Sequence, residues 1–559
     1  MALLRGAARG AANAARQRRP RRVLRRACAL AQQAQPQPLA REGSLEGKRV
    51  CVLGLGKSGT AAAALAAARG AAVVVGADAR ADAAPLHLPP RYEGTVCVES
   101  ALGEQVSAEA LARADVVVLS PGVPPDAPAV EAARAAGVIV YGELGFAAET
   151  LPAGLPLVAV TGTNGKSTVT TFAGQLLEAV GARCWVGGNL GVPLSALAEE
   201  LWLQGDQAAV GAYEAAVVEV SSYQLQTPGT LAPAAAAILN VTPDHLARHG
   251  TMEAYAEAKL NVFGRMGPGN VTVVPAADGA LIAKAAARAP GAAQCLLGVC
   301  EDTELVTAPG AWLTRSGHKA VVRLPEGAGR PALGADLLME VALDGLRTVG
   351  RHNRANAASA CLLAATVSPA ARDAAALSEA MRELEPPPHR MEVVGVGARD
   401  VLWINDSKAT NVESTIAGVG GLDRKAVVLL GGEAKEDASG ALGMERLMPA
   451  LQFHDCVVTF GASGPKIAAE LRAAGMADVL QPQDDGGASA NFDEAATLHP
   501  AAGCTLLELA PGATLAKAAA AGQQAARDGG ALVLSPACAS FDQFDNFEHR
   551  GRVFQELLG

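Results

Sequence analysis

The chain has 559 residues, enough for roughly three or four domains of ordinary size, so a single small module is excluded. Half of the residues are hydrophobic and only 18% are charged, which excludes a disordered polymer. The net charge of −9 combines ten Arg and no acid in residues 1–41 with a net −19 in the remainder. A body this acidic argues against sequence-independent binding of nucleic acid.

Residues 1–43 form a basic, Ala-rich leader that closes in a Gln- and Pro-rich spacer. This composition predicts a disordered organelle transit peptide, although such leaders are usually rich in Ser and the first Ser here is Ser44. A basic tail that touches RNA or a membrane is the alternative. The leader does not separate chloroplast from mitochondrion. Because no run of 18 apolar residues occurs in the chain, we expect a soluble protein without a membrane span.

From Ser44 onward, short runs rich in Val and Leu end in Gly, Ser, Thr or Asn and are followed by Ala-rich stretches. This alternation predicts an α/β protein in which crossover helices connect parallel strands. Ligands bind at the carboxyl ends of such strands, and the polar motifs of this chain directly follow the runs. The expected strands are Arg49–Leu53, Ala72–Val75, Asp115–Leu119, Leu157–Val160, Ala216–Val220, Ala235–Asn240, Val401–Ile404, Ala426–Leu430, Cys456–Phe460 and Ala531–Leu534.

Two Pro-rich segments, Leu151–Pro156 and Glu385–Pro388, predict domain boundaries. After the leader we therefore expect three tandem domains. Residues 44–150 should form a Rossmann-like domain, residues 151–385 a central parallel sheet of the P-loop ATPase kind, and residues 386–559 a C-terminal Rossmann-like domain. The polar stretch 481–502 is expected to be a surface insertion.

The first domain contains a Gly-rich turn at 52–59, Asp78 at the end of its second expected strand, and Ser120-Pro-Gly122 after its third. On fold grounds this domain could bind NAD, and a Gly-x-Gly turn is weak evidence for any one ligand.

The central domain begins with the strongest motif of the chain, a buried strand that leads into GTNGKST and a helix. Backbone amides of such a loop cradle phosphates, the lysine neutralises their oxygens, and a hydroxyl can reach Mg²⁺. The loop is shorter than the usual P-loop, because Val160 stands where that loop has Gly. We therefore expect ATP to contact Gly162, Thr163, Asn164, Gly165, Lys166, Ser167 and Thr168.

This shortened loop resembles that of the Mur ligase family, which also contains folylpolyglutamate synthase. Glu219, His245 and Lys259 match the family's metal-site pattern in order. The resemblance implies that they hold two Mg²⁺ ions together with Ser167, and that CO₂ converts Lys259 into a carbamate. Carboxylate and carbamate oxygens suit Mg²⁺ better than an amine does. The resemblance also implies ATP contacts from Asn353, Asn356, Arg390 and Asp406.

Three C-terminal motifs, at 403–411, 430–435 and 534–551, resemble those of family members that add D-glutamate to UDP-N-acetylmuramoyl-L-alanine (UDP-MurNAc-L-Ala). The resemblance implies an ATP-dependent amide ligase of peptidoglycan precursor synthesis that works through an acyl phosphate. The catalytic residues would be Lys166, Lys259, His245, Asp406 and Lys408. D-glutamate would bind at Thr410, Lys435, Ser540, Phe541 and Phe547, and the sugar nucleotide at Lys57, Ser58, Asp78, Arg80, Gly122 and Asn189.

Two alternatives stay open. A folylpolyglutamate-type ligase shares the central domain, but we expect it to lack the turn at 54–59 and the motif at 405–411. A catalytically weak organelle scaffold would retain the fold, although each chemical position that can be placed is intact. Ala79, Val412 and Ala247 depart from common family residues, which leaves the substrate affinity open. We expect small-molecule partners, a monomer, and a plastid rather than a mitochondrial location, since the implied function is that of a bacterial-type wall ligase.

Overall fold

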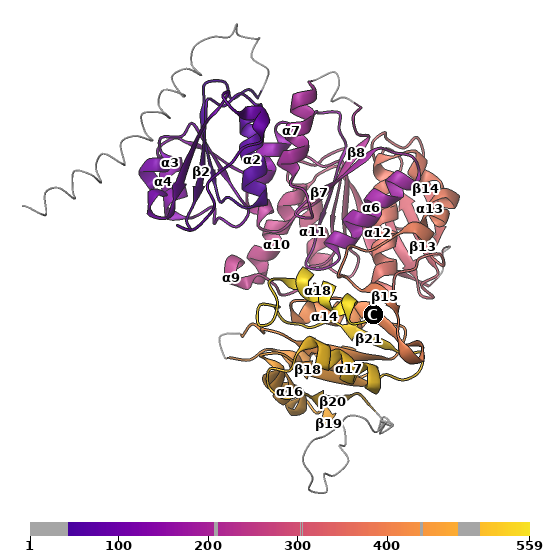
Figure 1. The fold of residues 1–559 in the computed structure, drawn as a ribbon. Coiled ribbons are helices and arrows are strands. Elements are labelled where there is room, and N and C mark those ends of the chain that lie inside the picture. Colours follow the sequence, from indigo (N-terminus) through magenta and orange to yellow (C-terminus); the bar gives the residue numbers. More distant parts are fainter. Residues whose placement is uncertain are drawn as a thin grey trace, which may run out of the picture.

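A computed structural model of the chain describes residues 43–205, 211–301, 303, 306–436, 440–478 and 503–558. The predicted leader, apart from Gly43, and the predicted insertion at 481–502 lie outside these residues. The described part contains three α/β sheets in chain order (Figure 1). Within it, no helix is both long and apolar enough to cross a membrane.

The first sheet has five parallel strands in the order β3-β2-β1-β4-β5. Its central strands are continuous runs of Val and Leu, as expected where helices cover both faces of a sheet. The strands are β1 Arg49–Leu53, β2 Val73–Asp78, β3 Cys97–Leu102, β4 Val116–Leu119 and β5 Ile139–Gly142, and the helices are α2 Lys57–Ala68, α3 Ala108–Leu111, α4 Pro128–Ala135 and α5 Glu143–Ala148.

The central sheet has the strand order β14-β13-β12-β11-β10-β9-β6-β8-β7 and is parallel from β7 to β12. At its other end β13 and β14 run antiparallel. The strands are β6 Leu157–Thr161, β7 Cys184–Gly188, β8 Ala215–Glu219, β9 Ala235–Ile238, β10 Val271–Pro275, β11 Ala293–Cys300, β12 Gly310–Thr314, β13 Lys319–Leu324 and β14 Leu337–Ala342. The helices are α6 Lys166–Ala179, α7 Leu194–Gln204, α9 Leu246–His249, α10 Met252–Leu260, α11 Gly279–Arg288, α12 Arg351–Val367 and α13 Ala374–Ala380.

The C-terminal sheet has the order β15-β16-β21-β17-β18-β20-β19, with only the β15/β16 pair antiparallel. The strands are β15 Glu392–Val396, β16 Leu402–Asn405, β17 Ala426–Gly431, β18 Cys456–Phe460, β19 Ala477–Asp478, β20 Thr505–Glu508 and β21 Ala531–Leu534. The helices are α14 Val412–Val419, α15 Met448–Leu451, α16 Gly464–Ala473, α17 Leu515–Ala525 and α18 Phe547–Glu556.

All ten predicted runs coincide with or overlap strands, and the α/β class is confirmed. The ten runs do not include the remaining strands, which are β3, β5, β7, β10 to β15, β19 and β20. In β14 exposed and buried residues alternate, and β3 carries exposed Glu99 and Ser100. A strand at a sheet edge is often polar on one face, so β3 and β14 do not form continuous apolar runs. Strand β13 is different, because it is mostly buried but its apolar run is short.

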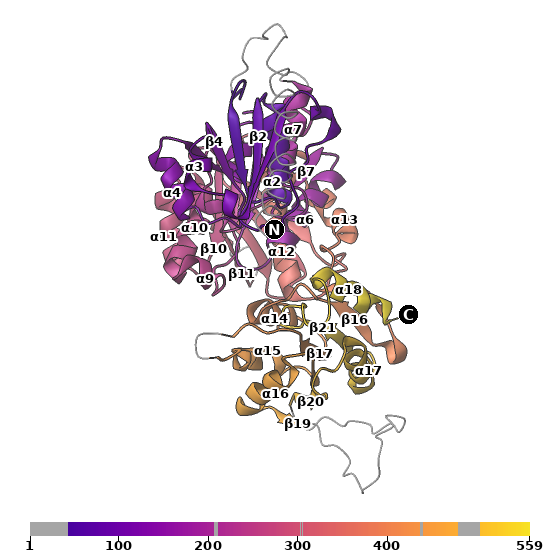
Figure 2. The same ribbon diagram turned by 60° about the vertical axis from the view of Figure 1, so that its left-hand side comes forward.

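The first and central sheets share one hydrophobic cluster. Helix α7 of the central domain packs against α2 and α5 of the first, and Leu65, Phe146 and Leu197 are fully buried there. The C-terminal sheet forms its own clusters, and of the described central-domain residues only Val349 packs against one of them. The C-terminal sheet stands below the other two in both ribbon views (Figures 1 and 2).

Candidate active site

The phosphate loop lies between β6 and α6, as the motif predicts. Gly165 caps α6 with a φ of +85°, a conformation that favours glycine, and a Cβ there would lie 2.9 Å from the Asn356 Oδ1. The Lys166 Nζ donates to the main-chain oxygens of Gly162 and Thr163, at 3.0 and 2.8 Å. Burial lowers the pKa of Lys166 to about 8, and the positive charge of Arg390 acts in the same direction.

Asn240, which directly precedes the expected metal segment, braces this loop. Its Oδ1 accepts from the amides of Thr163 and Asn164 at 3.0 and 2.8 Å, and its Nδ2 donates to the Asn164 oxygen at 3.0 Å. No role is predicted for Asn240 from the sequence. Its place as the polar last residue of the expected run at 235–240 is the signal that could have revealed it.

Glu219 ends β8 and turns into the space beside the loop. Its Oε1 accepts from the Asn189 Nδ2 at 2.7 Å, whereas its Oε2 is buried without a hydrogen-bond partner. Burial alone would raise the pKa of Glu219, but Lys166 and Asn189 outweigh it and the pKa lies below its ordinary value. A buried, ionised oxygen without a partner is costly, so this atom suits a cation.

Lys259 approaches the same loop from α10. Its side chain is 1% exposed, and its Nζ donates to the Gly162 oxygen at 2.8 Å and lies 4.4 Å from the ring centre of Tyr255. Burial, together with the charge of Lys166, lowers the pKa of Lys259 well below its ordinary value. A lowered pKa favours the neutral amine, which is the nucleophilic form of lysine.

His245 lies just before α9 with a φ of +55°. Its Nδ1 is 3.2 Å from the Tyr223 hydroxyl. Burial lowers its pKa, and Lys166, Lys259 and Lys435 lie close enough to add to this effect. Among the described residues, no three His, Cys, Asp or Glu side chains are grouped closely enough to hold a metal ion by themselves. An ion beside Glu219 would therefore need ligands of another kind, as Mg²⁺ usually finds in water and phosphate.

A cavity of about 120 Å³ joins the phosphate loop to the start of α12 and to the C-terminal domain. Arg390 crosses this junction, with its Nη2 3.4 Å from the Ser167 Oγ. Asp406 accepts from the Ser535 Oγ at 2.7 Å, and burial raises its pKa to about 7. The cavity brings together seven residues that the sequence assigns to ATP: Asn164, Gly165, Thr168, Asn353, Asn356, Arg390 and Asp406.

His352 also lines this cavity, and no role is predicted for it from the sequence. Its Nδ1 is buried without a hydrogen-bond partner, and burial lowers its pKa to about 4. It directly precedes Asn353, which was the available signal.

The expected D-glutamate residues surround the C-terminal ends of β16, β17 and β21. The Lys408 Nζ lies 5.1 Å from the ring centre of Phe547, and burial lowers the pKa of Lys408. Ser540 is buried, whereas Lys435 is exposed and Phe541 is 69% exposed. Thr410 is half-buried.

Arg550, another residue without a predicted role, ties two of these loops together. It is fully buried, with its Nε 2.9 Å from the Ser407 Oγ and its Nη1 3.0 Å from the Cys538 oxygen.

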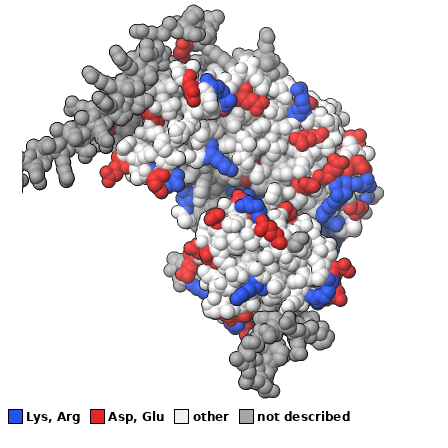
Figure 3. Space-filling model, in the orientation of Figure 1, with Lys and Arg blue, Asp and Glu red and all other residues white. Residues whose placement is uncertain are grey.

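In the first domain, Asp78 supports the Gly-rich turn. Its Oδ2 accepts from the Leu55 amide and its Oδ1 from the Arg80 amide, both at 3.0 Å. Lys57 is exposed and Ser58 half-buried at the start of α2, and Gly122 follows β4. Asn189 contacts Glu219 in the central domain, so it lies at the phosphate loop. Lys and Arg side chains gather around the hollow between the upper and lower parts of the molecule (Figure 3).

Two family descriptions match the chain. Mur ligase middle domain matches residues 160–364, and Mur ligase MurD-like, N-terminal domain matches residues 48–142. Curated proteins named UDP-N-acetylmuramoylalanine--D-glutamate ligase are similar over most of the chain. The protein from Anaeromyxobacter dehalogenans is 38% identical over 92% of this chain and 98% of its own length. The protein from Myxococcus xanthus is 38% identical over 92% of this chain and 99% of its own length. The protein from Koribacter versatilis is 32% identical over 92% of this chain and 98% of its own length.

Proposed function

The chain belongs to the Mur ligase family, and from this premise we propose a residue-level account of its reaction. It is an ATP-dependent, amide-forming ligase that adds D-glutamate to UDP-MurNAc-L-Ala in peptidoglycan precursor synthesis. The observation that carries this conclusion is the 38% identity to D-glutamate ligases over 92% of the chain.

The chemistry has two steps. The alanine carboxylate attacks the γ-phosphorus of ATP, and ADP leaves with the electron pair of the broken P–O bond. The amine of D-glutamate then attacks the acyl carbon, phosphate leaves, and the amine loses a proton. Little covalent help from the protein is needed, so catalysis depends on positioning and on neutralising charge. We assign the neutralisation of charge to Lys166, whose ammonium group already contacts the main chain of the phosphate loop.

Mg²⁺ fits this site because Glu219 offers a buried oxygen that lacks a partner. We propose that Glu219, Ser167, His245 and a carbamate on Lys259 hold two ions. When bound, Mg²⁺ polarises the phosphoryl group and offsets the charge that develops on its oxygens. The carbamate would form when the neutral Lys259 amine adds to CO₂ and loses a proton. The burial and low pKa of Lys259 support this step.

For ATP, we propose contacts from the phosphate loop (Gly162, Thr163, Asn164, Gly165, Lys166, Ser167 and Thr168) and from Asn353, Asn356, Arg390 and Asp406. The cavity that joins the loop, α12 and the C-terminal domain supports this assignment.

For D-glutamate, the exposed Lys435 is a suitable cation for the side-chain carboxylate, with Thr410, Ser540, Phe541 and Phe547 around it. Lys408 and Asp406 would approach the reacting groups from the same domain. For the sugar nucleotide, we propose Lys57, Ser58, Asp78, Arg80, Gly122 and Asn189. The hollow lined with Lys and Arg side chains suits these anionic substrates.

We further propose that residues 1–43 address the protein to the plastid. The support is the Arg-rich composition of this segment, whose first 41 residues contain no acid, ahead of a wall-type ligase. Fusing residues 1–43 to a fluorescent protein tests the proposal. Plastid fluorescence is expected, and mitochondrial or diffuse fluorescence would contradict it.

The reaction is tested by phosphate release from the full chain with ATP, UDP-MurNAc-L-Ala and each enantiomer of glutamate. We expect release that depends on D-glutamate and on the sugar nucleotide, and little release with L-glutamate. Release driven by a folate and L-glutamate would instead identify a folylpolyglutamate-type ligase. No substrate-dependent release would identify a scaffold.

A further inference from the structure

The first-domain loop Ser120–Val123 meets the central domain close to the active site, and one arginine joins them. Arg248, on α9, donates through Nη2 to the Val123 oxygen at 3.0 Å, and its Nη1 lies 3.4 Å from the Gly122 oxygen. Its Nε and Nη2 also donate to the Oε1 of Gln226 in the central domain, at 3.1 and 3.0 Å. The guanidinium thus connects segments more than a hundred residues apart in the chain.

The same guanidinium lies over Tyr223, with its Cζ 5.1 Å from the ring centre. The Tyr223 hydroxyl is 3.2 Å from the His245 Nδ1. A continuous set of contacts therefore runs from the first-domain loop through Arg248 and Tyr223 to His245. We call these three side chains the Arg248 relay.

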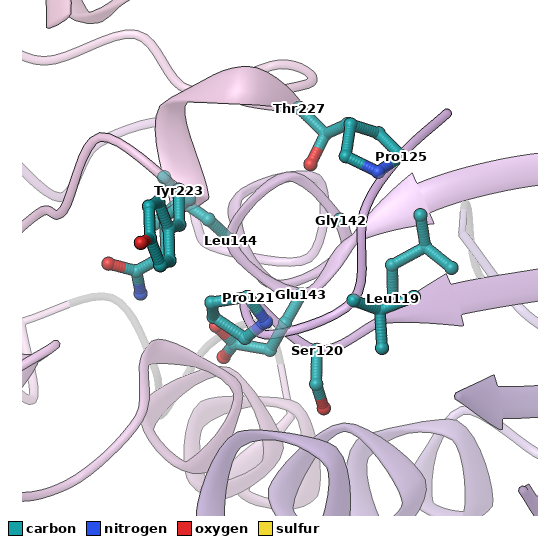
Figure 4. Close-up of a pocket in the computed structure, with 11 residues that line it drawn as sticks. Leu119, Ser120, Pro121, Pro125, Gly142, Glu143, Leu144, Tyr223 and Thr227 are labelled. Carbon is teal, nitrogen blue, oxygen red and sulfur yellow. The ribbon is translucent and has the colours of Figure 1, made fainter. Parts of the chain in front are cut away.

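The loop and the relay are closely packed. Tyr223, Ser120, Pro121 and Val123 line a cavity of about 10 Å³, a volume no larger than one water molecule needs. Figure 4 shows Tyr223 on one side of this cavity and Pro121 and Ser120 on another. Because so little space separates the Ser120–Val123 loop from Tyr223, any shift of the loop towards Tyr223 must either displace this side chain or be blocked by it.

We propose that Arg248 is a positioning residue, which fixes the Ser120–Val123 loop against the central domain and so sets where the sugar nucleotide lies relative to His245. This inference rests on the proposed function, in which Gly122 contacts the sugar nucleotide. Arg248 itself contacts no reacting group.

The residue type supports this role. The planar guanidinium of Arg248 contacts the main-chain oxygens of Gly122 and Val123 and the side-chain oxygen of Gln226. It also lies over the ring of Tyr223. Lysine has a single ammonium group and cannot donate in this flat geometry while covering the ring. Arg248→Lys should therefore restore the function only in part.

The chain offers a matched control at the same pair of domains. Arg91 of the first domain binds Glu199 of α7 at 2.7 Å. This ion pair also crosses from the first to the central domain, but the described contacts of Arg91 do not link it to the phosphate loop or to His245. Arg91→Ala removes a cross-domain arginine without touching the relay.

The test is isothermal titration calorimetry of UDP-MurNAc-L-Ala on the wild type, Arg248→Ala, Arg248→Lys and Arg91→Ala, with KM and kcat measured on the same proteins. We expect Arg248→Ala to raise Kd and KM for the sugar nucleotide about tenfold, as loss of charged hydrogen bonds does. Arg248→Lys should raise them less. Arg91→Ala should change them less than twofold, and KM for ATP should stay within twofold throughout.

Tyr223→Phe separates the two ends of the relay, because it keeps the ring and removes the hydroxyl. We expect kcat to fall several-fold while KM for the sugar nucleotide is unchanged. Equal losses for Arg248→Ala and Arg91→Ala, or an equal rise in KM for every substrate, would overturn the proposal. If the wild type binds the sugar nucleotide but shows no ligase activity, the proposed function is wrong. The binding test of Arg248 would still be valid in that case. If Arg248→Ala does not fold, the comparison of Kd and KM for the sugar nucleotide between Arg248→Lys and Arg91→Ala tests the proposal instead.

Discussion

The central domain meets its two neighbours in different ways. Its junction with the first domain is a continuous apolar cluster, in which α7 packs against α2 and α5. Its junction with the C-terminal domain rests largely on polar contacts, such as Arg390 to Ser167 and Ser414 to Asn164. Large apolar interfaces hold domains in place, whereas small polar ones permit relative motion. The first two domains should thus act as one body that carries the phosphate loop, and the third should move.

This contrast suits the proposed reaction. The phosphate loop, Glu219 and Lys259 lie within the central domain and are already in contact. Lys408 and Lys435 belong to the C-terminal domain and here lie near enough to interact electrostatically with Glu219 and His245. Opening of that domain would admit substrates, and its closure would restore this arrangement and exclude water.

The largest expected effect on activity comes from a substitution in the central domain, where the phosphate loop, Glu219 and Lys259 are already in contact. Lys259→Ala should lower kcat at least about a hundredfold. It removes the proposed carbamate oxygens that help to hold Mg²⁺, and with them part of the neutralisation of phosphate charge. Added formate should restore part of the activity by supplying a small carboxylate. Lys284→Ala, on the surface of α11 and paired with Glu257, is the control and should stay within twofold. Full activity of Lys259→Ala without formate would remove the carbamate from the account.

Next in size is the effect of loosening the apolar junction. Leu197 on α7 is fully buried in the shared cluster, so Leu197→Ala should cost about 2–5 kcal/mol of unfolding free energy. Urea unfolding followed by far-UV circular dichroism, which reports the helices of every domain, measures this loss, and the first and central domains should unfold together. Separate unfolding of the first domain in the wild type would show that the two are not one body.

Asp406 gives a pH-dependent effect on the C-terminal side of the nucleotide cavity. Burial raises its pKa from 3.8 to about 7, so its stabilising contribution is complete below about pH 4 and is lost as the pH rises through 7. Asp406→Asn should therefore be more stable than the wild type above pH 7, by up to about 4 kcal/mol, and the gap should shrink towards pH 4. Urea unfolding at pH 5, 7 and 8.5 measures it. A gap that does not change with pH would contradict the assigned shift.

The smallest effect is expected at the polar junction. Ser414→Ala removes the 3.2 Å hydrogen bond to the Asn164 side chain and should change the unfolding free energy by less than about 1 kcal/mol. KM for ATP should rise no more than about threefold by the same reasoning. A loss as large as that of Leu197→Ala would show that the two junctions are alike.

The sequence was most informative where chemistry and burial coincide. The GTNGKST loop and the strands before Glu219 and Asp406 were predictable, because continuous apolar runs lead directly into polar residues. Strand β14 was not, since exposed and buried residues alternate along it and it lacks such a run. Asn240, His352 and Arg248 were missed for another reason. Each acts through partners far away in the chain. Asn240 and His352 stand beside predicted motifs, but that position does not reveal which partners they contact.

Domain motion is tested most directly by distances between spin labels in solution. Cysteines at Arg113, Ala287 and Ala473 would place one exposed label on each domain, in a background whose accessible native cysteines are replaced by serine. On addition of UDP-MurNAc-L-Ala and a non-hydrolysable ATP analogue, the 113–287 distance should change by less than about 2 Å, and the 287–473 distance by more than about 5 Å. Equal changes in both distances, or no change in the second, would contradict the account.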